Sequence, residues 1–285
     1  MKTKLWMLEE TSEFMMSFVI VTDKNNAIVI DGGKAEDMPL LKKYVDGRHI
    51  SAWILTHAHD DHIQGFVHEL TENGLADFDV EKVYYNFPDY EQTRKHTEVT
   101  DYPYLCRELD EILPAFNASK EKIREKLQVV HQGDCLQIDE VKIEFLYVFH
   151  DGLYDNLMND ASLVFKLSTP RKSVLFLGDL GPQGGDVLYR ESRDKLAADI
   201  VQMAHHGHMN VGMEVYAAVG AKACLWCCRD WLYNEQEIPE WMHGWAEQVH
   251  SRNRMYGTAV TRKWMEQLGV KTHYVTANGT QEIDL

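Results

Sequence analysis

Three histidines and two aspartates fall within six consecutive positions of the chain, and all five are residue types that bind metal ions. The stretch reads His-Ala-His-Asp-Asp-His over residues 57–62. Directly before it, the apolar run 53–55 is typical of the end of a buried strand. Gly65 and the apolar residues after it favour a turn into a helix. The cluster is therefore predicted to lie on a strand-to-helix loop, at the mouth of a sheet.

The spacing within this cluster suits the binding of metal. His57 and His59 are two positions apart, so in an extended segment both imidazoles point the same way and can reach one ion. Asp61 and His62 follow as the chain turns and can reach a second point close by. Imidazole together with carboxylate suits zinc, iron, manganese or cobalt. The alternative is a solvated polar loop between a strand and a helix, which rarely holds this arrangement of residues.

Three later apolar stretches also end in histidine or aspartate, as would be expected if several strands of a layered fold contributed to one site at their common edge. An aspartate that closes a strand of almost pure hydrophobics must be solvated, paired or bound to a metal. The candidates at these ends are His150 after residues 141–148, Asp179 after residues 173–177, and His205, His206 and His208 after residues 199–204.

An aspartate also closes residues 17–33, where two β-branched runs flank the turn residues 23–26. This pattern predicts a β-hairpin whose second strand ends at Asp31. Two roles are open for this side chain. It is either a turn aspartate or a carboxylate that orients a metal-binding side chain from behind.

The order of strand-like and helix-like segments predicts an α/β protein. The chain has no internal repeat, low-complexity segment or linker rich in Pro, Gly and Ser, so we expect one domain over residues 1–285. Two stretches interrupt the pattern. Residues of about 88–128 are charged with helical spacing, which predicts a helical insertion. Residues of about 229–257, rich in Trp, Tyr, His and Arg, are expected to form a second insertion.

Composition bears on partners and location. The net charge of -16 argues against a nucleic-acid substrate and against anionic membrane surfaces. The first ten residues lack the apolar run of a signal peptide, and no apolar segment has the length of a transmembrane helix. Five cysteines, an odd number, fit reduced thiols. We expect a cytoplasmic protein with a small-molecule substrate and no membrane contact, and the oligomeric state stays open.

The pattern His-x-His-x-Asp-His resembles the signature of the metallo-β-lactamase superfamily, and it is met by His57, His59, Asp61 and His62. Residues 159–164, 176–179 and 205–207 are similar to one branch of it, which includes the hydrolase domain of bacterial competence proteins and the phosphorylcholine esterases. The resemblance covers most of the chain and implies a four-layer αββα sandwich. The branch usually has Ser or Thr where this chain has His208.

The family pattern implies a binuclear metal site. The first metal would be bound by His57, His59 and His150, and the second by Asp61, His62 and His205, with Asp179 as the bridge. His205 is chosen over His206 because relatives often keep only the first histidine of that pair. Asp61 and His206 are then the expected catalytic residues, with His206 in acid chemistry or substrate contact. Asp31 and His208 are expected to orient ligands or to contact the substrate.

The implied chemistry is hydrolysis. Two divalent ions, zinc first with manganese or iron as alternatives, share a water and lower its pKa toward neutrality. The resulting hydroxide is expected to attack a phosphoester or phosphodiester, the substrate class that the branch suggests. The alternatives are a lactone, thioester or amide hydrolase on the same metals, and a diiron redox or sensor protein. Because fold does not fix chemistry, the substrate stays open.

Overall fold

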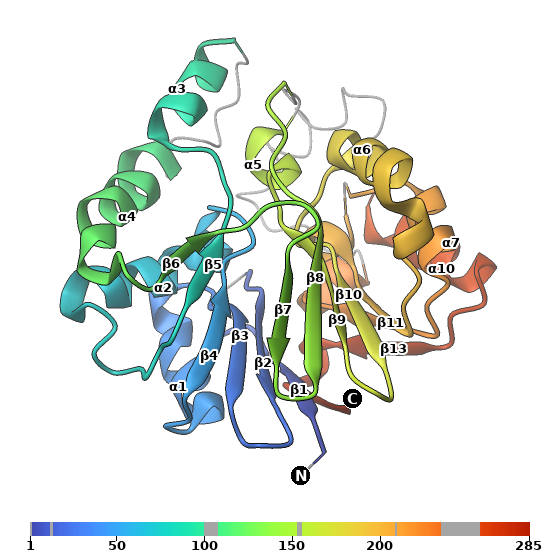
Figure 1. The fold of residues 1–285 in the computed structure, drawn as a ribbon. Helices are drawn as coiled ribbons and strands as arrows, with labels where there is room; N and C mark the ends of the chain where they lie inside the picture. The colour runs from blue at the N-terminus through green and yellow to red at the C-terminus, as the bar shows by residue number, and fades with distance from the viewer. Residues whose placement is uncertain (1, 12–13, 100–107, 153–155, 209, 235–256) are drawn as a thin grey trace.

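The computed structural model describes residues 2–11, 14–99, 108–152, 156–208, 210–234 and 257–285, and its two sheets pack face to face between outer helices (Figure 1). The first sheet joins four antiparallel neighbours to three strands added in parallel. Its strands, in spatial order, are β14 (Gln281–Asp284), β1 (Lys4–Met7), β2 (Ser17–Val21), β3 (Ala27–Asp31), β4 (Ile50–Ile54), β5 (Val83–Tyr85) and β6 (Leu127–Val129).

The second sheet has the same mixed character, because an antiparallel half is again followed by a parallel half. Its strands, in spatial order, are β7 (Cys135–Ile138), β8 (Val141–Tyr147), β9 (Val164–Ser168), β10 (Ser173–Phe176), β11 (Ile200–Gln202), β12 (Ala223–Trp226) and β13 (Thr272–Val275). The predicted hairpin is confirmed, since β2 and β3 pair antiparallel with Ser17 opposite Asp31.

Helices cover the outer face of each sheet. Those that pack on the first sheet are α1 (Met38–Val45), α2 (Asp60–Asn73) and α4 (Leu113–Ser119), and those on the second are α6 (Pro182–Ser192), α7 (Met213–Val219) and α10 (Thr258–Gln267). The shorter or peripheral helices are α3 (Tyr90–Val99), α5 (Leu157–Asp160) and α8 (Asp230–Tyr233). Single helical turns are η1 (Ala35–Asp37), η3 (Glu108–Ile112), η4 (Lys120–Ile123), η5 (Arg193–Lys195), η6 (Ala204–Gly207) and η7 (Thr276–Asn278).

Three apolar layers hold these four structural layers together. Strand β2 is buried at every position, and its side chains alternate between two layers. Phe18 and Ile20 belong to the layer between the sheets, whereas Val19 and Val21 face the outer helices of the first sheet. This is the two-residue period of a strand that is covered on both faces. The expected four-layer αββα sandwich is therefore confirmed.

The two expected insertions are only partly described. Within the first, at about 88–128, Leu113 and Phe116 pack in the outer layer of the first sheet, and β6 extends that sheet along the edge of β5. Residues 100–107 of this insertion and residues 235–256 of the second lie outside the described residues. Among the helices that are described, none combines the length and the apolar character needed to cross a membrane.

Helix α2 carries two site residues in its first turn, and its position depends on a glycine. The N–H of Gly65 donates a hydrogen bond to Gly33 O at 2.8 Å. A Cβ atom at position 65 would lie 2.6 Å from Met38 Sδ and 2.7 Å from Lys34 O. The helix can therefore approach the loop after β3 this closely only because residue 65 has no side chain.

We predict that Gly65→Ala destabilises the protein by about 1–3 kcal/mol, the usual cost of overpacking. Helix propensity alone would favour alanine over glycine by about 1 kcal/mol. A loss of stability in Gly65→Ala would therefore come from the steric clash of the added Cβ atom. Gly32→Ala is the matched control, because a Cβ there would have its nearest neighbour at 3.5 Å. Urea unfolding of both variants tests this, and an unchanged Gly65→Ala protein would contradict it.

Candidate metal centre

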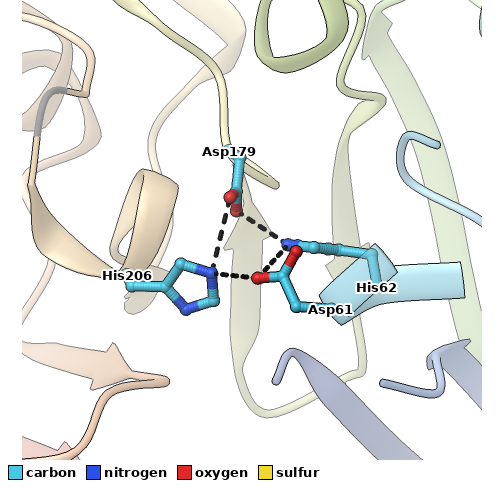
Figure 2. A group of neighbouring side chains, drawn as sticks. All are labelled: Asp61, His62, Asp179 and His206. Carbon is cyan, nitrogen blue, oxygen red and sulfur yellow. Dashed lines mark hydrogen bonds and ion pairs between the residues drawn. The ribbon is translucent and has the colours of Figure 1, made fainter. Parts of the chain in front are cut away.

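Four side chains from both sheets meet at one end of the sandwich (Figure 2). Asp61 and His62 lie in the first turn of α2, Asp179 follows β10, and His206 lies in η6 after β11. One potential ligand atom of each lies within 4.8 Å of the others. Because α2 packs on the first sheet whereas β10 and β11 belong to the second, the site is formed only when the two sheets have packed.

The distances within this group show that the carboxylates and rings face a common point. Asp61 Oδ2 lies 3.0 Å from His206 Nε2 and 3.7 Å from His62 Nε2. Asp179 Oδ1 lies 3.2 Å from His62 Nε2, and Asp179 Oδ2 lies 3.5 Å from His206 Nε2. Figure 2 shows both carboxylates directed toward the two imidazoles.

A second group consists of His57, His59 and Asp179, whose ligand atoms also lie within 4.8 Å of one another. His57 Nε2 is 2.9 Å from His59 Nδ1 and 4.0 Å from Asp179 Oδ2. Asp179 therefore belongs to both groups. This is the position that a bridging carboxylate would need.

His62 is oriented by Asp31. Asp31 Oδ2 lies 2.8 Å from His62 Nδ1, and the carboxylate accepts hydrogen bonds from Thr56 N at 2.7 Å and Thr56 Oγ1 at 2.6 Å. Asp31 holds the ring at Nδ1, so that Nε2 faces Asp61 and Asp179. Of the two roles considered for Asp31, the contact with His62 is the one seen here. Thr56 was not singled out in the sequence, although it directly precedes His57.

His206 is held in the same manner. Its Nδ1 lies 2.6 Å from Cys227 O, a backbone acceptor, so Nε2 is directed toward Asp61. The ring also packs against Phe14, with ring centroids 5.2 Å apart. Nothing in the sequence pattern pointed to Phe14, which reaches the site from the loop between β1 and β2.

Two buried atoms indicate that the site fits a metal ion. Within the described part of the chain, neither His62 Nε2 nor Asp179 Oδ1 has a hydrogen-bond partner, and the 3.2 Å contact between them is an ion pair only when His62 is protonated. Buried polar atoms without a partner are rare in folded proteins. An ion coordinated by both would satisfy them, and imidazole with carboxylate is a donor set that suits zinc, iron or manganese.

Electrostatics favour a cation here. Burial opposes the ionisation of Asp179, but the His62 and His206 imidazoles outweigh it and hold the pKa of this carboxyl well below its usual range. Burial also disfavours charge on His206, yet Asp179 and Asp61 raise its pKa to about 8. Burial beside His62 and His59 lowers the pKa of His57 well below its usual value. Burial also opposes charge on His62, but Asp179, Asp61 and Asp31 raise its pKa well above its usual value. The group therefore holds ionised carboxylates beside protonated imidazoles, and a bound metal ion would replace the protons of His62 and His206.

Two expected ligands lie outside both groups. His150 stacks on Tyr147, with centroids 5.1 Å apart and planes inclined at 28°, and its Nε2 lies 3.9 Å from Glu191 Oε2. His205 has its Nε2 3.9 Å from Asp179 Oδ2 and stacks on His208, with centroids 4.3 Å apart. The structure thus places His206, and not His205, with Asp61 and His62.

The backbone conformation explains why His206, and not the expected His205, lies in the group with Asp61 and His62. His205 and His206 both adopt positive φ values, of 49° and 55°, which few non-glycine residues do. This left-handed turn directs successive side chains to different sides, so His206 enters the group while His205 and the buried His208 lie beside it.

We predict that His206→Asn removes one metal ion per chain, whereas His205→Asn retains both. Asparagine tolerates a positive φ, so both variants should keep the turn. Metal affinity at the group of Asp61 and His62 should fall by at least about 10-fold to 100-fold in His206→Asn, the range seen when partners behind a ligand are lost. Metal content after dialysis measures this. Loss of an ion from His205→Asn alone would reverse the assignment.

Comparisons with known proteins agree with this architecture. A sequence model described as the metallo-beta-lactamase superfamily matches residues 14–104, which include His57 to His62. Among curated proteins, none matches the chain. The solved structure of the metallo-β-lactamase fold protein YhfI from Bacillus subtilis is similar, with a TM-score of 0.56 and 12% identity, over 99% of this chain and 100% of that one.

A second similar structure is CmlA from Streptomyces venezuelae, described as a diiron β-hydroxylase. It has a TM-score of 0.53 and 11% identity, over 100% of this chain and 54% of CmlA. At these identities the likeness concerns the fold alone. Two mixed sheets flanked by helices match the metallo-β-lactamase sandwich. The family model matches less than half of the chain, so what is shared over the whole chain is the fold.

Proposed function

We propose that this protein is a metal-dependent hydrolase that binds two divalent metal ions. The observation that carries the proposal is the shared position of Asp179, whose carboxylate belongs to both groups of candidate ligands. His57, His59 and Asp179 would hold one ion. The other would be held by the four residues of Figure 2, Asp61, His62, Asp179 and His206.

A pair of divalent ions, when bound, would polarise a substrate oxygen and lower the pKa of water toward neutrality. The side chains supply the geometry. Asp31 fixes the His62 ring and the Cys227 carbonyl fixes the His206 ring, so neither ring has to reorient during turnover. Preorganised donors of this kind avoid a reorganisation cost at the moment of reaction.

His205 and His208 lie outside the two groups but next to Asp179 and His206. His205 Nε2 lies 3.9 Å from Asp179 Oδ2, and its ring stacks on that of His208. We propose that His205 contacts the substrate and provides the proton for a departing group, the role first expected for His206. Burial beside His205 and His206 lowers the pKa of His208 well below its usual value, so His208 is proposed to support the His205 ring as a neutral partner. His206 and Asp61 are proposed as metal ligands.

A phosphoester or phosphodiester is the preferred substrate class. The preference rests on the resemblance of residues 159–164, 176–179 and 205–207 to phosphoesterase-type relatives. These segments surround the site. Ser162 Oγ accepts a hydrogen bond from Asp179 N at 2.9 Å, and Asn159 Nδ2 lies 3.4 Å from His205 Nε2. Lactone, thioester or amide hydrolysis on the same ligands is the alternative.

Zinc is the proposed metal, with manganese or iron as alternatives, because all three suit imidazole and carboxylate ligands. The similarity to a diiron protein concerns the fold alone, so a redox function is the competing proposal that metal analysis must separate. A small-molecule substrate, the exclusion of nucleic acid and a cytoplasmic location stay predictions from composition and charge.

We predict that protein loaded with Zn²⁺, Mn²⁺ or Fe²⁺ hydrolyses bis(p-nitrophenyl) phosphate or p-nitrophenyl phosphate faster than a lactone or a thioester. Asp179→Asn should lower the rate by more than about 100-fold, since the loss of a shared ligand exceeds the loss of a partner behind one. Asp77→Asn is the control, because it removes an exposed carboxylate that pairs with Lys42.

Two other results would change the proposed function. Faster turnover of the lactone or thioester would reverse the substrate order and keep the hydrolase assignment. Two retained irons with a visible absorption band, and no hydrolysis of any substrate, would contradict the hydrolase and favour the redox alternative.

A further inference from the structure

The side chain of Gln202 forms hydrogen bonds between β10 and β11 beyond the point at which their backbone pairing stops. The parallel pairing brings Val174 beside Ile200 and Leu175 beside Val201, and it goes no further. Beyond it, Gln202 Oε1 accepts a hydrogen bond from Leu177 N at 2.8 Å. The residue is fully buried, so its amide is shielded from water.

The amide group donates as well. Gln202 Nε2 donates to Gly178 O at 3.0 Å and to Met203 O at 2.6 Å, so both of its N–H groups and its oxygen have backbone partners. The same Gly178 carbonyl accepts a hydrogen bond from His205 N at 3.1 Å. The loop after β10 is therefore tied by three hydrogen bonds to the end of β11 and the loop that follows it, two of them from the Gln202 side chain.

These hydrogen bonds lie next to the proposed ligands in the sequence. Gly178 directly precedes Asp179, and His205 directly precedes His206. Gly178 has a φ of 56°, and a Cβ there would lie 2.9 Å from Ser162, so its conformation leaves little freedom to compensate for a lost partner. A shift of either loop would change the distance of 3.5 Å between Asp179 Oδ2 and His206 Nε2.

We propose that Gln202 is a positioning residue for the metal centre: its side-chain amide sets the separation of the Asp179 carboxylate and the His206 ring. The proposal rests on the proposed metal site. Gln202 contacts neither ligand side chain in the hydrogen bonds described, and it acts through the backbone of residues 177–178. Without its amide, the buried N–H of Leu177 would lose its acceptor, which is costly enough to displace the loop.

The same two strands offer a matched control at their opposite ends. Ser173 N and Ser173 Oγ donate to Asp199 Oδ2 at 2.9 Å and 3.1 Å, and Asp199 N donates to Ser173 Oγ at 3.1 Å. This contact also joins β10 to β11 through side chains, but it lies at the amino ends of the strands, away from the metal ligands. Ser173→Ala weakens strand pairing without touching the loops of the site.

The experiment compares Gln202→Met, which keeps the length of the side chain and removes its hydrogen bonds, with Ser173→Ala. For parent and variants, calorimetric titration of metal-free protein with Zn²⁺ gives affinity and stoichiometry, and urea unfolding gives stability. Both variants should be less stable than the parent. Only Gln202→Met should also bind zinc more weakly, by about 10-fold to 100-fold, the range for residues that orient metal ligands.

The outcomes distinguish a failure of the role proposed for Gln202 from a failure of the proposed metal site. If the parent binds two zinc ions and Gln202→Met binds them equally well, or if Ser173→Ala loses as much affinity, Gln202 is not a positioning residue. If the parent binds no zinc, iron or manganese, the metal site itself is refuted, and this proposal with it.

A measurement on the parent covers the case in which Gln202→Met does not fold. Native-state hydrogen exchange should show the Leu177 amide protected as strongly as the amides of β10, although its acceptor is a side chain. Rapid exchange at Leu177 would overturn the proposal.

Discussion

A carboxylate buried among imidazoles is the constraint on which this end of the molecule depends. Asp179 is 1% exposed, and its oxygens lie within 4.0 Å of ring nitrogens of four histidines, which are His57, His62, His205 and His206. A buried ionised group is stable only when it is paired or bound to a metal. Protonated histidines can provide this pairing, and metal ions can replace those protons, so metal binding and proton release are expected to be linked.

The fold brings these charges together by aligning strand ends. Strands β3 and β4 of one sheet and β10 and β11 of the other are followed by the loops that carry the site residues, and the ends of parallel strands are where α/β folds usually bind ligands. A backbone hydrogen bond also joins the two sheets near the site. Leu163 N donates to Thr56 O at 2.9 Å, which links the start of β9 to the residue before His57.

Much of this could be predicted from the sequence, because local patterns were strong. The hairpin ending at Asp31 followed from β-branched runs around a turn. The strands that end in His or Asp indicated a layered fold with a site at one edge, and the resemblance to the metallo-β-lactamase superfamily implied the four-layer sandwich. The five ligand candidates His57, His59, Asp61, His62 and Asp179 lie at the ends of apolar strands, and the structure brings them together. Their role as metal ligands stays a prediction.

The positions of the other site residues depend on backbone and packing geometry that the spacing of residues in the sequence does not show. The choice between His205 and His206 turns on two consecutive positive φ values. His150 follows an apolar strand as the others do, yet its ring stacks on Tyr147 and lies outside both groups. Thr56 and Phe14 carry no motif, and their contacts with Asp31 and His206 arise only after strands and loops far apart in the sequence have packed.

The central claim is that one carboxylate is shared by two metal positions, and anomalous diffraction from crystals of the zinc-loaded protein tests it most directly. The account predicts two peaks per chain. One should lie among Asp61, His62 and His206, the other beside His57 and His59, and both should be within coordination distance of Asp179. A single ion, or an ion pair in which Asp179 coordinates only one member, would contradict the claim.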